Sequence, residues 1–209
     1  KKVAKLSRAE LDELEACTCL SEAEIVGVFA KFRELGGQHA PLLDSHLLED
    51  VDDEAQKQPT RRREKRVAAE DIVKLSEFEL NPLAEQLCKT FSSDGSGALS
   101  FEDLLDLYNV LSPKAPRELK TQAAFRIYDY DGDGFLNEDD LHKLLKALSH
   151  GPGLEESETL SDEDIESLVH RVMAAGDVDR NNRLNYSEFR KIMNRIPDFP
   201  ARFRVPIDS

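Results

Sequence analysis

Two stretches of twelve residues concentrate oxygen-bearing side chains at a regular spacing. The first runs from 129 to 140 as DYDGDGFLNEDD, and the second runs from 177 to 188 as DVDRNNRLNYSE. In both, carboxylate or amide side chains stand at positions 1, 3, 5, 9 and 12. Carboxylates this close repel one another, whereas several oxygens around one point form the ligand shell that Ca²⁺ and Mg²⁺ prefer. The spacing therefore predicts two sites for a divalent cation.

We predict that each loop ligates its ion through positions 1, 3, 5, 7, 9 and 12. In the first loop these positions hold Asp129, Asp131, Asp133, Phe135, Asn137 and Asp140. In the second loop they hold Asp177, Asp179, Asn181, Arg183, Asn185 and Glu188. Position 7 would contribute its backbone carbonyl, and the apolar residues at position 8, Leu136 and Leu184, would pair the loops through a short β contact. This is the EF-hand pattern of helix, loop and helix.

The two loops differ at two positions. Glu188 is long enough to bind Ca²⁺ through both carboxylate oxygens, whereas Asp140 is one methylene shorter. We therefore expect loop 177–188 to select Ca²⁺ and loop 129–140 to accept Mg²⁺ as well as Ca²⁺. Position 6 needs a positive φ, which Gly134 adopts freely, and Asn182 is the next most tolerant residue type for that conformation.

Two further copies of the unit are degenerate. Residues 92–103, SSDGSGALSFED, keep the frame but only two carboxylates at ligand positions, so we favour a structural role over metal binding there. Its partner would lie between a helix within 21–37 and a short helix at 68–77, with no ligand pattern left between them. We expect that unit to have the EF-hand shape without an ion.

Apolar residues recur at helical spacing, as in Ile165, Val169, Val172 and Met173, and no long alternating strand pattern is present. The predicted fold is all-α: a two-lobed EF-hand protein with four helix–loop–helix units and short paired β contacts between loops. The predicted N-terminal lobe is 1–111, with the two degenerate hands. The predicted C-terminal lobe is 112–209, with the two metal-binding hands and the C-terminal tail.

Two segments lack this regular pattern. Residues 36–66 open on Gly-Gly, pass through an acidic half and end in the basic run RRREKR, which predicts a long mobile insertion with a short helix at 42–51. For the basic run we favour a solvated linker over a nuclear signal or an anionic-lipid contact. The tail 197–209 holds three prolines, so it cannot continue a helix, yet it carries Phe199 and Phe203. It either packs as an ordinary terminus or forms a displaceable plug.

Composition excludes several functions. The net charge of −14 argues against nucleic acid as a partner, because phosphates repel an acidic surface. The three cysteines include no C-x-x-C pair, so we expect free thiols rather than disulfides or zinc. The histidines fall in the predicted insertion (His39, His46) or on helix faces (His142, His170), and no nucleophile motif or phosphate loop is present. We expect no enzyme activity.

Several motifs resemble those of the calcium and integrin-binding protein family. They are ELNPLAEQLCKTFS, SFEDLLDLYNVLS, PRELKTQAAFRIYDYD and the ending RIPDFPARFRV, and the similarity spans about 11–207. The resemblance implies four EF-hands with only the third and fourth loops occupied. It also implies an apolar groove that binds helical cytoplasmic segments of membrane proteins, integrin α tails and a mechanotransduction channel among them, and kinases as further partners.

The sequence thus predicts a Ca²⁺/Mg²⁺-binding EF-hand regulatory protein that binds an amphipathic helix. The alternatives are a regulatory subunit of a kinase or phosphatase and a simple Ca²⁺ buffer; a buffer barely opens on binding ions, whereas a sensor exposes apolar surface. We expect a cytoplasmic location, with contact to the plasma membrane only through the partner or an N-terminal lipid.

Overall fold

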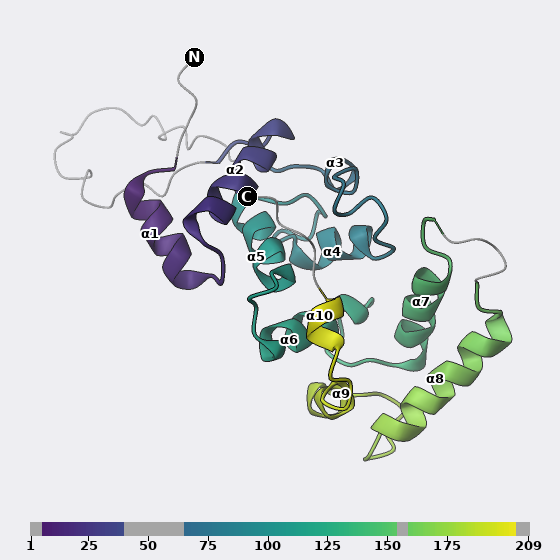
Figure 1. The fold of residues 1–209 in the computed structure, drawn as a ribbon. Coiled ribbons are helices and arrows are strands. Elements are labelled where there is room, and N and C mark those ends of the chain that lie inside the picture. The colour runs from purple at the N-terminus through teal and green to yellow at the C-terminus, as the bar shows by residue number, and fades with distance from the viewer. Residues whose placement is uncertain (1–5, 40–64, 154–158, 204–209) are drawn as a thin grey trace, which may run out of the picture.

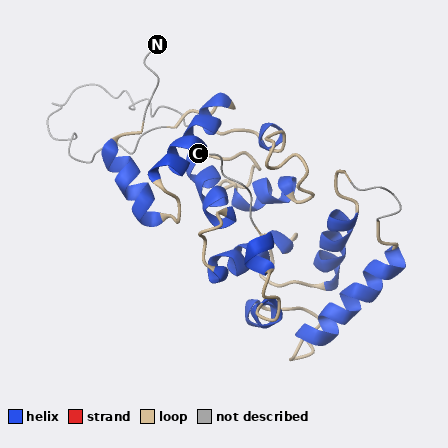
Figure 2. Cartoon of the chain, viewed as in Figure 1, coloured by secondary structure: helices blue, strands red, loops and turns tan. Residues whose placement is uncertain are grey.

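The computed structural model describes residues 6–39, 65–153 and 159–203, which form helices joined by loops and turns, with no strand among them (Figures 1 and 2). The predicted all-α class is confirmed. The helices are α1 (Arg8–Cys17), α2 (Glu22–Glu34), α3 (Ala69–Ile72), α4 (Ala84–Phe91), α5 (Phe101–Leu111), α6 (Arg117–Tyr128), α7 (Glu138–Ser149), α8 (Asp162–Gly176), α9 (Tyr186–Met193) and α10 (Phe199–Arg202).

The exit helix of each loop begins at a capping box made by loop residues. Asn137 caps α7 and bonds back to Asp140, and Asn185 caps α9 and bonds back to Glu188. Positions 9 and 12 of the loop are thus the N-cap and N3 residues of the helix, each satisfying a backbone N–H that the helix leaves free. Helix α8 also begins at a capping box, with Ser161 as its N-cap and Asp164 at N3.

Extended contacts join the loops in pairs. Leu136 and Leu184 exchange two backbone hydrogen bonds of 2.9 and 2.8 Å in an antiparallel bridge, as predicted. Val67 and Leu99 form the equivalent bridge in the N-terminal half, with two bonds of 2.8 Å. The paired β contacts of the predicted fold are therefore confirmed, and each pair of hands has its own.

Helix α6 contributes residues to both clusters of buried apolar side chains (Figure 1). The first cluster of buried apolar residues is built mainly by α2, α4 and α5, and it includes Ala123 and Ile127 of α6. The second cluster is built mainly by α8 and α9, and it includes Ala124 and Phe125 of the same helix. The hand pairs thus share one helix, whose opposite faces belong to different cores.

The structure differs from the sequence-based expectations at three segments. Helix α3 ends at Ile72, and the rest of the helix expected at 68–77 forms turns that bury Phe78. Helix α9 ends before the prolines as expected, but the tail then forms the single turn α10, because proline fits the first turn of a helix. Helix α1 was not anticipated.

The ends of the expected insertion belong to the fold. Gln38 and Lys65 form an antiparallel bridge, with bonds of 2.9 and 2.8 Å. His39 was assigned to the insertion, but its side chain is only 9% exposed and packs against the rings of Phe29 and Phe101. Residues 40–64, with the short helix expected at 42–51, lie outside the described residues.

Candidate metal centres

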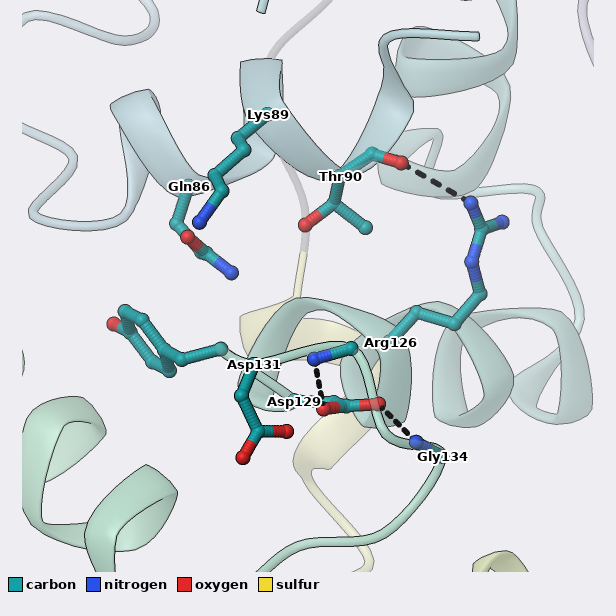
Figure 3. A pocket seen from close by; sticks show the side chains of 9 residues that line it. Gln86, Lys89, Thr90, Arg126, Asp129, Asp131 and Gly134 are labelled. Carbon is teal, nitrogen blue, oxygen red and sulfur yellow. Dashed lines mark hydrogen bonds between the residues drawn. The ribbon is translucent and has the colours of Figure 1, made fainter. Parts of the chain in front are cut away.

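Loop 129–140 brings its first three acidic side chains to one point. Carboxylate oxygens of Asp129, Asp131 and Asp133 all lie within 4.8 Å of one another. The loop backbone holds Asp129 in place, because Gly132 N–H and Gly134 N–H donate to its two oxygens at 2.7 and 2.9 Å (Figure 3). The turn therefore aims its predicted ligands inward through its own amide groups.

Loop 177–188 makes the same arrangement with a different third member. Oxygens of Asp177, Asp179 and Glu188 lie within 4.8 Å of one another. Asn181 N–H and Asn182 N–H donate to the two oxygens of Asp177 at 3.1 and 2.9 Å. Position 12 of this loop thus joins the converging carboxylates, as a bidentate Ca²⁺ ligand must.

Position 12 behaves differently in the first loop. Asp140 is fully buried but does not belong to the converging group. Its two oxygens accept the N–H groups of Tyr130 and Asn137, both at 3.1 Å. Glu188 accepts the equivalent N–H groups, yet its extra methylene also places it among the other carboxylates. The shorter side chain of Asp140 leaves it farther from the point where the other ligands meet.

Predicted ligands at positions 9 and 7 form hydrogen bonds within their own loops. Asn137 and Asn185 at position 9 are the N-caps described above, and the side-chain N–H of Asn137 also donates to Asp131 at 3.4 Å. At position 7, the Phe135 N–H donates to Asp133 at 2.8 Å and the Arg183 N–H donates to Asn181 at 3.0 Å. Both bonds use the amide nitrogen of position 7 and not its carbonyl, which the pattern assigns to the ion.

Backbone conformation at two loop positions favours glycine. Position 6 has a positive φ, +83° at Gly134 and +63° at Asn182, as predicted. Position 4 also has a positive φ, +75° at Gly132 and +59° at Arg180, which was not predicted from the sequence. A residue with a Cβ is strained in this region. Arg180 therefore destabilises the second loop slightly, whereas Gly132 adopts the same conformation in the first loop without strain. The glycine at position 4 of the first loop could have revealed it.

One carboxyl group in each loop has a shifted pKa, and the two shifts have opposite directions. Burial, reinforced by the negative charges of Asp131 and Asp129, raises the pKa of Asp140 above its usual range. Burial also acts to raise the pKa of Asp177, but hydrogen bonds from the loop amides outweigh it and leave that pKa lowered. The crowded charge that raises the pKa of Asp140 is what a divalent cation would neutralise.

The side chains at position 7 contact each other across the loop pair. The guanidinium of Arg183 lies 3.9 Å from the centre of the Phe135 ring, a cation–π contact. The residues next to them form the Leu136–Leu184 bridge. The two loops are therefore joined by main chain and side chain at neighbouring positions.

A pocket opens beside loop 129–140, where the loop faces α4 (Figure 3). Its walls include Gln86 and Lys89 of α4 and Arg126 of α6. The Arg126 guanidinium donates to the carbonyl of Thr90 at 3.1 Å, which ties α6 to the end of α4. Two positive side chains thus stand near the acidic loop and reduce the repulsion among its carboxylates.

The donor set of both loops fits a hard divalent cation. Each offers three converging carboxylates, further side-chain oxygens and backbone carbonyls, and neither offers sulfur or imidazole within the loop. Oxygen donors of this kind suit Ca²⁺ and Mg²⁺. When bound, such an ion would supply the positive charge that holds the ligand residues together. Loop 92–103 has carboxylates at only two ligand positions and forms no comparable group among the described residues.

The fold and the loops define the chain as an EF-hand calcium-binding protein, and residues 118–194 match the family model of an EF-hand domain pair. The chain is 34% identical to calcium and integrin-binding family member 2 of Drosophila melanogaster, over 99% of this chain and 98% of that protein. It is 30% identical to family member 2 and 29% identical to family member 3 of Homo sapiens, each over 95% of this chain and 94% of the relative. The chain belongs to the calcium and integrin-binding family.

Membership of this family identifies a Ca²⁺-binding regulatory protein, as the sequence motifs predicted. The names of the relatives describe binding proteins rather than enzymes. Among the described helices, none has the length and apolar character that would let it cross a bilayer.

Proposed function

We propose that this protein responds to Ca²⁺ and Mg²⁺ and binds an amphipathic helix from the cytoplasmic part of a membrane protein in an apolar groove beside α6. The twelve loop residues from Asp129 to Glu188 named above would hold the two ions. Loop 177–188 would select Ca²⁺, and loop 129–140 would accept Mg²⁺ as well. Relatives are named for integrin binding, so an integrin α tail is the first partner to test.

The observation that carries the proposal is the position of the C-terminal segment. Phe199 is only 7% exposed and belongs to the second apolar cluster, while Phe203 packs against both clusters. The two rings lie 5.4 Å apart. A short aromatic segment of the chain thus covers apolar surface at the junction of the two cores, the kind of surface that an amphipathic helix covers in a complex.

Side chains of helix α6 donate hydrogen bonds to the backbone carbonyls of this C-terminal segment. The side chain of Lys120 is fully buried, and its ammonium donates to the carbonyls of Pro200 at 3.1 Å and Phe203 at 2.6 Å. Arg117 donates to the carbonyl of Ile196 at 2.7 Å. A buried ammonium is costly without such partners. A helix that replaced the tail would have to offer acceptors of its own, and the free carbonyls at a helix C-terminus are suitable.

In this proposal the two halves of the chain have different tasks. Residues 112–209 contain both predicted ion sites and the tail, so ion binding acts there. Residues 1–111 contain the degenerate hands and would act as an ion-independent support that shares α6 with the second half. Contact with the plasma membrane would come through the partner or an N-terminal lipid.

Removing the tail should strengthen partner binding. We expect deletion of 198–209 to tighten the binding of an integrin α-tail peptide in saturating Ca²⁺ by about tenfold, or about 1.4 kcal/mol, because the tail no longer competes. Calorimetric titration of the peptide measures this. Since the deletion also removes the two carbonyls that Lys120 contacts in the tail, Phe203→Ala serves as a second variant that keeps them, and the exposed Leu80→Ala is the matched control.

Two results would contradict the proposal. One is an unchanged or weaker affinity for both tail variants. The other is an apolar-surface dye whose fluorescence does not rise when Ca²⁺ is added, since that result describes a buffer rather than a sensor.

A further inference from the structure

The degenerate loop 92–103 keeps the internal hydrogen bonds of an ion-binding loop. Asp94 at position 3 accepts the Ser96 N–H at 3.0 Å, as the position-3 carboxylates of the other loops accept the N–H of their position-5 residues. Asp103 at position 12 accepts the Ser100 N–H at 3.1 Å, and the other position-12 carboxylates accept the same amide. The oxygens that would face an ion therefore keep their places, although the loop has lost most of its charge.

A guanidinium from outside the loop contacts those oxygens. Arg66 reaches position 12 through Nη1, at 2.6 Å from Asp103 Oδ2, and position 7 through the same nitrogen, at 3.2 Å from the Ala98 carbonyl. Its Nε lies 3.2 Å from Asp94 Oδ2 at position 3, and its Nη2 donates to Ser93 Oγ at 2.8 Å. Positions 3, 7 and 12 are all ligand positions of an EF-hand loop.

The pairing of the two N-terminal hands explains how Arg66 gets there. Val67 pairs with Leu99, which is position 8 of loop 92–103, just as Leu136 pairs with Leu184. Arg66 therefore stands at position 7 of the first hand, the position that Phe135 holds in the third. A long side chain at this position extends across the bridge toward the partner loop, and in the C-terminal pair Arg183 makes its contact across the bridge in the same way.

We propose that the guanidinium of Arg66 takes the place of the divalent ion in loop 92–103. The N-terminal pair of hands is then held together by a cation of the chain itself, whether or not Ca²⁺ or Mg²⁺ is present. A guanidinium suits this task because its five N–H donors lie in a rigid plane and can serve several oxygens at once. A surface ion pair would not account for the contacts, since one side chain joins two carboxylates, a carbonyl and a hydroxyl.

The degree of burial supports this assignment. The side chain of Arg66 is 23% exposed and that of Asp103 is 9% exposed, so their ion pair is shielded from water far more than a surface pair. The same oxygen that Arg66 contacts, Asp103 Oδ2, also accepts the Ser93 N–H at 3.3 Å, the Ser93 O–H at 3.2 Å and the Ser100 N–H at 3.1 Å. Charge-assisted bonds at such sites are about twice as strong as neutral ones.

The proposal confines ion sensing to the C-terminal half. It also assigns the last residue of the basic run RRREKR to a structural contact, which makes Arg66 unavailable for lipid or nuclear-import recognition. The other residue of that run that the structure describes is Lys65, which is exposed.

Restoring ligands to the loop tests whether Arg66 occupies the cation position. The test uses three chains that all carry Ser92→Asp and Asp103→Glu, which give the loop carboxylates at three ligand positions. The first chain has no further change, the second adds Arg66→Ser and the third adds Lys65→Ser. Titration of Ca²⁺ by calorimetry, with native mass spectrometry for the ion count, is the readout. We expect the Arg66→Ser chain to bind an additional ion at least about tenfold more tightly than the other two.

The matched control separates position from charge, because Lys65→Ser removes the same charge one residue away. Equal uptake by all three chains, or no additional ion in the Arg66→Ser chain, would overturn the proposal. The C-terminal sites are common to the three chains, so a failure of the proposed function would remove the same ions from each and leave this comparison intact.

A second measurement needs no metal. In excess chelator, we expect Arg66→Ser and Asp103→Asn to lower the melting temperature of the full chain by less together than the sum of their separate effects, because each removes the same interaction. Strict additivity of the two effects would count against Arg66 as the loop cation.

Discussion

At the scale of single residues, one methylene distinguishes the two ion sites. Glu188 satisfies two loop amides and still reaches the converging carboxylates, whereas Asp140 satisfies the equivalent amides and falls short of them. Mg²⁺ is bound by fewer protein oxygens than Ca²⁺ and retains several waters. On this basis we propose that the loop with the shorter residue accepts Mg²⁺ and the loop with the longer residue selects Ca²⁺.

Lengthening Asp140 should change the ion preference of the first loop. We expect Asp140→Glu to raise the affinity of loop 129–140 for Ca²⁺ by about tenfold and to weaken competition by Mg²⁺, because the longer carboxylate can contribute both oxygens. Calorimetric Ca²⁺ titrations with and without millimolar Mg²⁺ measure both effects. Glu188→Asp is the matched control and should do the opposite in the second loop. Unchanged Ca²⁺ affinity and Mg²⁺ competition in the Asp140→Glu chain would refute the assignment.

At the scale of helices, a histidine links α1 to the body of the fold. His39 Nε2 lies 3.6 Å from Glu10 of α1, and Nδ1 lies 3.2 Å from Glu102 of α5. The interaction with the Glu102 carboxylate raises the pKa of His39, with a smaller contribution from Glu10, and both outweigh the opposing effect of burial. Helix α1 has no fully buried residue of its own, and its Leu11 and Leu14 pack partly buried against the first apolar cluster. The contacts of His39 add to this packing.

The attachment of α1 should depend on pH. Because the pKa of His39 is higher in the folded chain than the usual value of about 6.5, its contribution to stability is complete below about pH 6.5. This contribution is lost as the pH rises through the pKa that His39 has in the folded chain. We expect the free energy of unfolding in chelator to fall as the pH rises above about 6.5, and His39→Gln to flatten this fall.

His170→Gln is the control for this measurement, since His170 pairs with Glu138 at the surface, where ion pairs contribute little. Denaturant titrations at each pH give the free energies. An equal pH dependence in the wild-type and His39→Gln chains would show that His39 is not a charged link between α1 and α5.

At the scale of the whole molecule, a chain with a net charge of −14 folds around two apolar cores that share α6. The two loops of the C-terminal pair each bring three carboxylates together, whereas loop 92–103 has carboxylates at only two ligand positions. Divalent ions that bind the folded chain and not the unfolded chain stabilise it by mass action. The global stability of the protein should therefore report on ion concentration.

Ca²⁺ should stabilise the whole chain through both C-terminal loops. At a free concentration about a thousandfold above the dissociation constant, each site should add about 4 kcal/mol to the free energy of unfolding. Thermal and denaturant melts with Ca²⁺ and with chelator measure the change. Asp129→Ala combined with Asp177→Ala is the control and should abolish the response. A response of equal size in that double variant would place the stabilising ions elsewhere.

Much of the molecule could be predicted from local patterns. The ligand types recur at fixed intervals within twelve residues, and the same residues cap the following helix, so loop and helix are determined together. The apolar residue at position 8 predicted the Leu136–Leu184 bridge. The helical period predicted the class, and motifs spread along the chain predicted the family.

The sequence by itself thus determined the class of fold, the family and the candidate ion loops, because each depends on residues a few positions apart. Tertiary structure alone decided what Arg66, Lys120 and His39 do. Arg66 meets Asp103 across 37 positions, and Lys120 meets Phe203 across 83. No periodicity records such contacts, since the polar groups become neighbours only when separate helices pack and water is excluded from between them.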